Sequence, residues 1–155
     1  EIKEVLSPAR QICIFVAALG HDVGHPGFNN LFHINMSHDL AIVYNDCSVL
    51  ENFHAAELMR ILARPFGKSS KKLLAGLSAA QFHQERKIMI KLILSTDMSK
   101  HVADLADFRL ALDNPKFDPV ETPTDQDMAL MWLFRASDIS HSAKPWEVHQ
   151  EWSHR

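Results

Sequence analysis

The stretch LGHDVGHPGFNN, residues 19–30, does most to define this chain. It places two imidazoles and a carboxylate within five residues, and the apolar run ICIFVAAL (12–19) leads into it. Buried polar groups need partners, and imidazole and carboxylate both bind divalent cations. The pattern therefore predicts metal chemistry around His21, Asp22 and His25, at the end of a buried helix.

Length and composition describe one soluble domain. The chain has 155 residues, of which 46% are apolar and 23% charged, and its net charge of -3 argues against a nucleic-acid surface. Its two cysteines, Cys13 and Cys47, are unclustered, which excludes a CxxC metal site and indicates reduced thiols in a cytoplasmic protein.

The apolar run 12–19 is far shorter than the roughly 18 residues of a membrane span, and there is no signal peptide. We therefore expect no membrane contact from this segment. The chain starts without methionine and closes within the helix-like pattern VHQEWSHR, so we expect it to be cut at both ends.

Capping residues and apolar spacing predict helices along the chain. Ser7-Pro8 starts one whose inward face is Ile12, Phe15, Val16 and Leu19, and Pro26-Gly27 stops it. Ser48 and Glu51 form a capping-box pattern that opens a second helix, which ends at Pro65 and Gly67. A linker, KSSKK (68–72), follows.

Another capping box, Ser78 to Gln81, opens a helix that runs to Thr96-Asp97, and the next helix spans 101–112. The segment DNPKFDPVETPTD (113–125) has three prolines and predicts a loop before a last apolar helix. No strand-like alternation of useful length occurs. The expected fold is all-α, a compact multi-helix bundle with one long loop near 115–123.

Two further carboxylates lie on apolar helix faces. Asp138 follows Met131 and Phe134 at helical spacing, and Asp97 follows Ile93 in the same way, so both are expected to point inward. Each has a plainer alternative: Asp138 pairs with an arginine or ends its helix, and Asp97 lies in an exposed turn. Glu51 has its capping role as the alternative.

The HExxH motif of zinc proteases does not fit residues 21–25. The second position is Asp22, one methylene shorter than the general-base glutamate, and Pro26 blocks a helix beyond His25. A helix-end histidine with a satisfied aspartate remains an alternative to a metal site.

Four motifs follow one another along the chain: HDVGHPGFNNLFHI (21–34), LAIVYNDCSVLENFH (40–54), LSTDMSKH (94–101) and RASDISHSAKPW (135–146). Together they resemble the catalytic domain of class I cyclic nucleotide phosphodiesterases. The resemblance implies an all-helical domain that hydrolyses the 3′ bond of cyclic AMP or GMP with two divalent cations, zinc and magnesium (or manganese). It makes residues 1–155 the central portion of one such domain.

The resemblance also assigns roles. His21, Asp22 and Asp138 match metal ligands. The family's residues that order metal-bound water correspond here to His25, Glu51, Thr96 and Asp97. Its substrate-binding positions correspond to Met98 and His141. Paired cations can activate water at neutral pH and clamp phosphate oxygens during in-line attack.

In the family, the proton donor and a further metal-binding histidine come from an upstream motif, and the purine-binding glutamine follows the region near Trp152. All lie outside this chain, which we therefore expect to be weakly active or inactive alone. Two departures from the family pattern are Gly24, where many members have an acid, and Phe53, which replaces the first histidine of ENHH.

Two other functions stay open. One is a nucleotide-binding module of the same fold that does not cleave its ligand. The other is a hydrolase of the broader HD class, which shares His21 and Asp22 but leaves the YNDxSVLE and TDMSKH segments unexplained. The sequence leaves open the preference between cyclic AMP and cyclic GMP, the regulatory domains and the oligomeric state.

Overall fold

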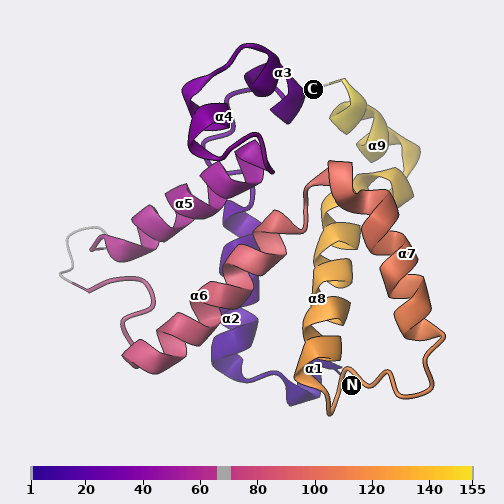
Figure 1. Cartoon of the computed structure of the whole chain (residues 1–155). Helices are drawn as coiled ribbons and strands as arrows, with labels where there is room; N and C mark the ends of the chain where they lie inside the picture. Colours follow the sequence, from indigo (N-terminus) through magenta and orange to yellow (C-terminus); the bar gives the residue numbers. More distant parts are fainter. Residues whose placement is uncertain (1, 66–70, 155) are drawn as a thin grey trace.

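The computed structural model describes residues 2–65 and 71–154, and this part of the chain is helical with no strand (Figure 1). The α-helices are α1 (Ile2–Val5), α2 (Pro8–Gly20), α3 (Asn30–Asn35), α4 (Asp39–Val43), α5 (Val49–Ala63), α6 (Ala79–Leu94), α7 (His101–Leu112), α8 (Pro123–Asp138) and α9 (Trp146–Ser153). Short 3-10 helices, η1 (Met98–Lys100) and η2 (Ile139–Ala143), lead into α7 and follow α8. The prediction of an all-α fold is confirmed.

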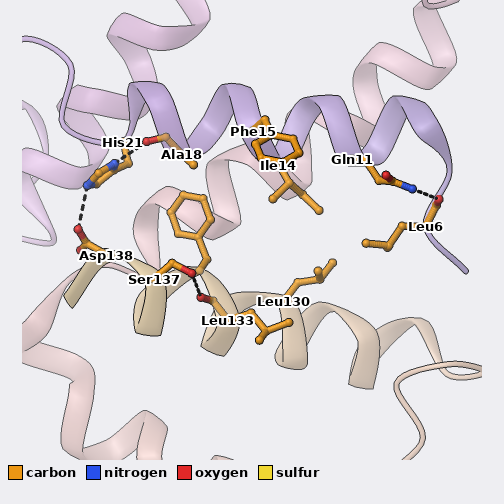
Figure 2. A pocket seen from close by; sticks show the side chains of 11 residues that line it. Leu6, Gln11, Ile14, Phe15, Ala18, His21, Leu130, Leu133, Ser137 and Asp138 are labelled. Carbon is orange, nitrogen blue, oxygen red and sulfur yellow. Dashed lines mark hydrogen bonds and ion pairs between the residues drawn. The ribbon is translucent and has the colours of Figure 1, made fainter. Parts of the chain in front are cut away.

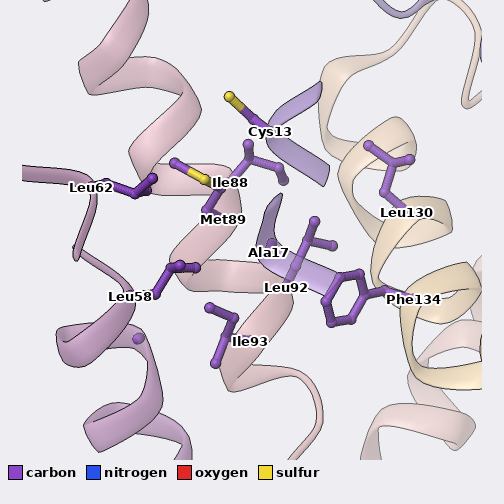
Figure 3. Close-up of a cluster of buried hydrophobic side chains, with 11 residues drawn as sticks. Cys13, Ala17, Leu58, Leu62, Ile88, Met89, Leu92, Ile93, Leu130 and Phe134 are labelled. Carbon is purple, nitrogen blue, oxygen red and sulfur yellow. The ribbon is translucent and has the colours of Figure 1, made fainter. Parts of the chain in front are cut away.

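The core lies where α6 packs against α2, α5 and α8. Figure 3 shows the apolar side chains that these four helices direct toward one another. The cluster consists of Cys13, Ala17, Ala55, Leu58, Leu62, Ile88, Met89, Leu92, Ile93, Leu130 and Phe134. Removing apolar area from water at this junction is the main force that holds the four helices together.

Most of the predicted inward face of α2 is exposed, and of its four residues only Val16 packs against the core. Cys13, Ala17 and Gly20 are buried, whereas Phe15 is 71% exposed and Leu19 is 89% exposed. A nearly continuous apolar run fits more than one helical face, so spacing alone could not choose between them. The small residues face inward because they let the backbones of neighbouring helices come close.

Gly20 marks the tightest approach in this packing. A Cβ placed there would lie 2.7 Å from Cδ1 and 3.1 Å from Cδ2 of Leu58. We expect Gly20→Ala to lower the free energy of unfolding by about 1–3 kcal/mol through overpacking. Urea unfolding measures this, with Gly76→Ala as control because a Cβ at Gly76 meets no atom within 4 Å. Equal effects of the two substitutions would contradict the packing described.

All three predicted helix starts are confirmed, since a serine is the N-cap of α2, of α5 and of α6. The Ser7 hydroxyl accepts a hydrogen bond from the Arg10 amide, and Ser78 forms a complete capping box with Gln81. The capping box at Ser48 is wrong, since Ser48 is left-handed (φ 43°) and makes no side-chain cap. Instead Asn30, from α3, accepts the Leu50 amide proton of α5 at 2.8 Å.

Other segments differ modestly from expectation. Helices α3 and α4 were not predicted, since each is only one or two turns long. The loop before α8 is shorter than expected because α8 already begins at Pro123. Within this loop, the Asp118 carboxylate accepts hydrogen bonds from the amides of Val120 and Glu121. Residues 66–70, which hold Gly67 and most of the predicted linker, lie outside the described residues.

The described helices bear on two further expectations. None is long and apolar enough to cross a membrane. The cysteines are not joined to each other, as predicted: Cys13 is buried in the core and Cys47 is exposed.

His33 is an unusual buried histidine in α3. It is 2% exposed, and neither ring nitrogen has a hydrogen-bond partner in the structure. Burial, reinforced by the nearby His38 and His25, lowers its pKa below the ordinary 6.5. The unfolded chain therefore takes up a proton at a higher pH than the folded chain does.

We therefore expect the contribution of His33 to the free energy of unfolding to fall as the pH drops from about 7.5 to about 5.5, because protonation of this residue favours the unfolded state there. His33→Leu should remove this contribution, which denaturant unfolding of both proteins at several pH values measures. His83→Leu, at an exposed site on α6, is the control. An unchanged pH slope in His33→Leu would contradict the account.

Candidate metal centre

His21 and Asp138 are brought together from opposite ends of the chain. His21 caps the C-terminus of α2, Asp138 is the last residue of α8, and 117 positions separate them. Figure 2 shows Nε2 of His21 facing Oδ1 of Asp138, a distance of 3.0 Å. Asp138 ends its helix, as the plainer alternative had it, and is exposed and not buried, but its carboxylate faces a histidine and not an arginine.

The hydrogen bonds of His21 determine which ring nitrogen is available to bind a cation. Nδ1 lies 2.8 Å from the Ala18 carbonyl, which can only accept, so Nδ1 carries a proton. In the neutral ring, Nε2 would then direct a lone pair at the Asp138 carboxylate, and the two would repel each other. A second proton on the ring, or a cation between the two groups, removes this repulsion. Without a metal ion, the hydrogen bond to Asp138 raises the pKa of His21 to about 9.

Asp22 lies between two imidazoles. Oδ2 is 3.6 Å from Nε2 of His21, and Oδ1 is 3.7 Å from Nε2 of His54. His54 is buried on α5 and its Nδ1 bonds the Val23 carbonyl at 2.9 Å, which turns Nε2 toward Asp22. Burial lowers the pKa of His54 below its ordinary value.

The donor set fits a divalent cation. Zinc lies about 2.0–2.2 Å from nitrogen and oxygen ligands, so neighbouring ligand atoms of a tetrahedral site are roughly 3.3–3.6 Å apart. The His21–Asp22 distance of 3.6 Å lies at the upper end of this range, and the His21–Asp138 distance of 3.0 Å lies below it.

Among the residues described, no group of three or more His, Cys, Asp and Glu side chains is arranged so that it could hold a metal ion. The carboxylate of Asp22 would therefore have to turn. Its side chain is 62% exposed, which permits this rotation.

His25 lies next to this group without joining it directly. Its ring stacks on that of His54, with centroids 5.5 Å apart, and its Nδ1 accepts a hydrogen bond from the Gly27 amide. His25 is therefore linked to Asp22 through His54. Electrostatic interaction also links Glu51 to His54, since the Glu51 carboxylate opposes the lowering of the His54 pKa.

Asn30 binds Glu51 and also caps α5, the helix that carries Glu51. Oε2 of Glu51 accepts a hydrogen bond of 2.9 Å from Nδ2 of Asn30, whose Oδ1 accepts the Leu50 amide proton. One asparagine thus aligns α3 with the start of α5. Glu51 and Asp97 both line a cavity of about 420 Å³, together with Thr96 and Met98.

Asp97 is buried, as predicted, and accepts a dense set of hydrogen bonds. Oδ1 accepts from the amide and hydroxyl of Ser99, and Oδ2 accepts from the Ser48 hydroxyl at 2.7 Å. Burial alone would raise the pKa of Asp97. These hydrogen bonds, with the Lys100 charge, outweigh burial and hold the pKa below its usual range.

Ser48 joins α5 to the segment that carries Asp97. We expect Ser48→Ala to lower the free energy of unfolding by about 1.5–3 kcal/mol, because it loses a hydrogen bond to a buried carboxylate and keeps a β-carbon in a left-handed conformation. Ser48→Gly loses the same hydroxyl together with the β-carbon, but glycine adopts the left-handed conformation without strain, so this variant should cost less. Thermal unfolding compares the two variants, and an equal loss in both would show that the backbone conformation contributes nothing.

The two predicted substrate-binding residues have different surroundings. Met98 is exposed and lines the cavity beside Asp97. His141 lies in η2, three residues after Asp138, and its Nδ1 is 3.1 Å from Nδ1 of His149 in α9. The structure therefore places Met98 with the Glu51–Asp97 group and pairs His141 with α9.

The two departures from the family pattern lie together. Gly24 has a positive φ of 76°, and a Cβ there would lie 3.2 Å from the Phe53 ring. The aromatic ring therefore occupies the space beside a residue without a side chain. Two changes that look unrelated in the sequence form one apolar contact at the edge of the site.

Three residues that matter here were not singled out from the sequence as parts of the site. His54 could have been a surface histidine on its spacing, Asn30 lies in an unpredicted helix, and Ser48 resembled a helix cap. A partial signal existed for His54, because it follows Glu51 by three positions and so shares a helix face with it.

Comparison with known proteins gives a consistent result. The sequence profile of the family described as 3′5′-cyclic nucleotide phosphodiesterase matches residues 1–155. A relative from Plasmodium falciparum, the dual 3′,5′-cyclic-AMP and -GMP phosphodiesterase beta, is 37% identical over 94% of the chain and 12% of its own length. A probable 3′,5′-cyclic-AMP phosphodiesterase, pde-4 from Caenorhabditis elegans, is 36% identical over 99% of the chain and 23% of its own length.

Among solved structures, the phosphodiesterase domain of the RhoPDE fusion protein from Salpingoeca rosetta superposes with a TM-score of 0.85 and 32% identity. The match covers 96% of this chain and 46% of that chain. The chain thus spans less than a quarter of the two curated relatives and less than half of the solved domain.

Proposed function

Because the chain belongs to the 3′,5′-cyclic nucleotide phosphodiesterase family, we propose that it supplies the metal centre with which its whole protein hydrolyses the 3′ phosphoester bond of a cyclic nucleotide. The observation that carries this proposal is the meeting of His21, Asp22 and Asp138 across 117 positions of sequence. A carboxylate on each side of one imidazole nitrogen is a donor set for cations.

The family acts with divalent metal ions, and we propose zinc and magnesium or manganese for this chain. His21, with Nε2 available, and Asp138 would hold the zinc-like ion, and Asp22, which has two carboxylate oxygens, would reach both ions. Bound cations would supply charge to the phosphate oxygens and lower the pKa of a water molecule.

The remaining site residues would position the substrate and water. Asn30 holds the carboxylate of Glu51 by a hydrogen bond, His54 lies beside the carboxylate of Asp22, and His25 packs on His54. Both carboxylate oxygens of Asp97 accept hydrogen bonds. Asp97 and Met98 line the same 420 Å³ cavity. We propose that this cavity and His141 lie along the nucleotide path.

We also propose that residues 1–155 form the central portion of one catalytic domain in a cytoplasmic protein. The proposal covers both cyclic AMP and cyclic GMP as substrates. A dual-specificity relative and a probable cyclic-AMP relative are 37% and 36% identical to this chain. We expect the isolated chain to turn over substrate poorly, since the proton donor and purine contact of the family pattern fall outside it.

The test is hydrolysis of cyclic AMP and cyclic GMP by the whole protein, with the products separated by chromatography. The proposal predicts 5′-monophosphate as the product, loss of turnover on chelation, and recovery on adding Mg²⁺ or Mn²⁺. Formation of the 3′-monophosphate, or turnover that resists chelation, would contradict it. Tight binding of cyclic nucleotide without turnover would favour the binding-module alternative.

A further inference from the structure

A separate cavity lies between the C-terminal half of α5, the start of α6 and the segment 71–78 that leads into α6. Its volume is about 690 Å³, which is within the range of cavities that hold small organic ligands. Figure 1 shows the end of α5 and the start of α6 on the opposite side of the molecule from α8 and α9. The cavity shares no lining residue with the candidate metal centre, so it is a different site.

The walls of this cavity are apolar. Its large apolar side chains come from all three segments: Met59, Leu62, Leu74, Leu77 and Phe82. Its other apolar lining residues are alanines, which leave space between the large side chains: Ala56, Ala63, Ala75 and Ala79. Because Leu62 also belongs to the hydrophobic core, one wall is part of the most firmly packed region. Burying a hydrocarbon chain against such walls is favourable.

The charged residues that line the cavity are all basic. Among the described lining residues they are Arg60, Lys72 and Arg86, and no aspartate or glutamate accompanies them. All three are exposed, so their charges lie toward solvent at the mouth of the cavity. Arg60 pairs with Glu57 on its own helix. In the described part of the chain, neither Lys72 nor Arg86 forms an ion pair.

We propose that this cavity binds a long-chain carboxylate, such as a free fatty acid. The hydrocarbon tail lies against the apolar walls, and the carboxylate binds Lys72 and Arg86 at the mouth. An arginine can donate two parallel hydrogen bonds to a carboxylate, and a lysine adds a second positive charge. The charge at the mouth and the apolar interior together carry the proposal, so it does not depend on whether the protein turns over a nucleotide.

The lining disfavours other classes of ligand. None of the described lining residues is His, Cys, Asp or Glu, so the cavity offers a metal ion no side-chain ligand. None is Asn, Ser or Thr either, so no side chain there accepts a hydrogen bond from the amino group of a purine. Inorganic phosphate would bind the basic groups but leave the apolar walls in water. An anionic bilayer would meet only the mouth, so the ligand enters as a free molecule.

Displacement of a fluorescent fatty acid tests the proposal on the protein expressed from its complete coding sequence. The probe is dansyl-labelled undecanoate, whose fluorescence rises in an apolar site, and laurate is the competitor. Butyrate carries the carboxylate without the tail, and dodecyltrimethylammonium carries the tail with the opposite charge. Arg86→Gln changes the mouth and Ala75→Trp fills the cavity. Lys87→Gln is the matched control, because Lys87 is the exposed neighbour of Arg86 on α6 and does not line the cavity.

The proposal predicts that laurate displaces the probe and that butyrate and dodecyltrimethylammonium do not. Arg86→Gln should weaken laurate binding about tenfold, the effect of losing a hydrogen bond to a charged group. Ala75→Trp should abolish laurate binding, and Lys87→Gln should bind laurate as the unaltered protein does. Thermal unfolding checks that each variant is folded. If Ala75→Trp is unfolded, the comparison of Arg86→Gln with Lys87→Gln decides.

Three results would overturn the proposal. The first is a whole protein that does not bind the probe, which includes the case in which another segment of the same protein fills the cavity. The second is equal laurate affinity in Arg86→Gln and Lys87→Gln. The third is binding to phosphatidylserine vesicles without binding of free laurate, which would identify a membrane surface in place of a ligand cavity.

Discussion

Asp22→Asn in the whole protein is expected to lower kcat for cyclic nucleotide hydrolysis by about 1,000-fold, because metal-assisted charge stabilisation contributes several kcal/mol to the transition state. Asp22 is the carboxylate that approaches two imidazoles, and we propose that it would bind the cations. An amide keeps the shape of the side chain but removes its charge, so the fold should be retained. Steady-state kinetics at saturating Mg²⁺ measures the loss.

The matched control for this substitution is Asp127→Asn. Asp127 lies on α8 and forms a surface ion pair with Lys91, at 3.0 Å. Surface pairs contribute about 1 kcal/mol or less to stability, so this variant should retain full activity. If Asp22→Asn kept more than a tenth of the wild-type kcat, Asp22 could not be a shared metal ligand.

Asp138→Ala is expected to weaken divalent metal binding by about 100-fold or more, since changes even to groups behind the ligands cost 10- to 100-fold. The reason is geometric, because Asp138 supplies the oxygen closest to Nε2 of His21. Isothermal calorimetry with Zn²⁺ and Mn²⁺, on the whole protein and on the 155-residue chain, measures the change.

The result also reports on the fold of the isolated chain. Metal binding that Asp138→Ala abolishes would show that the 155 residues assemble a centre from two distant motifs. Binding that is unchanged in Asp138→Ala would contradict the proposed ligand set. If only the whole protein binds metal, then further ligands from outside the chain are required.

The fold class and most helix limits follow from local signals. Ser7 and Ser78 cap their helices as predicted because each cap depends only on residues within one turn. The inward face of α2 could not be predicted, because the apolar run offers several faces and only the packing partner selects one. The role of the Ser48 hydroxyl could not be predicted either, since it donates a hydrogen bond to Asp97, 49 positions away.

The candidate site shows the same division. The sequence predicted inward orientations for Asp97 and Asp138. Asp97 is buried, whereas Asp138 is exposed at the end of α8 and faces His21. It could not show that Asp138 meets His21, that His54 is buried beside Asp22, or that Gly24 faces Phe53, because each contact joins separate helices or loops. The roles assigned to His25, Glu51, Asp97, Met98 and His141 stay predictions.

A crystal structure of the protein grown with Zn²⁺ and Mn²⁺, with anomalous scattering recorded at both metal edges, tests the central claim most directly. The account predicts an anomalous peak bonded to Nε2 of His21 and to carboxylate oxygens of Asp22 and Asp138, and a second peak that Asp22 also reaches. Metal at another histidine group, such as His33 with His38, and none at His21 would contradict it.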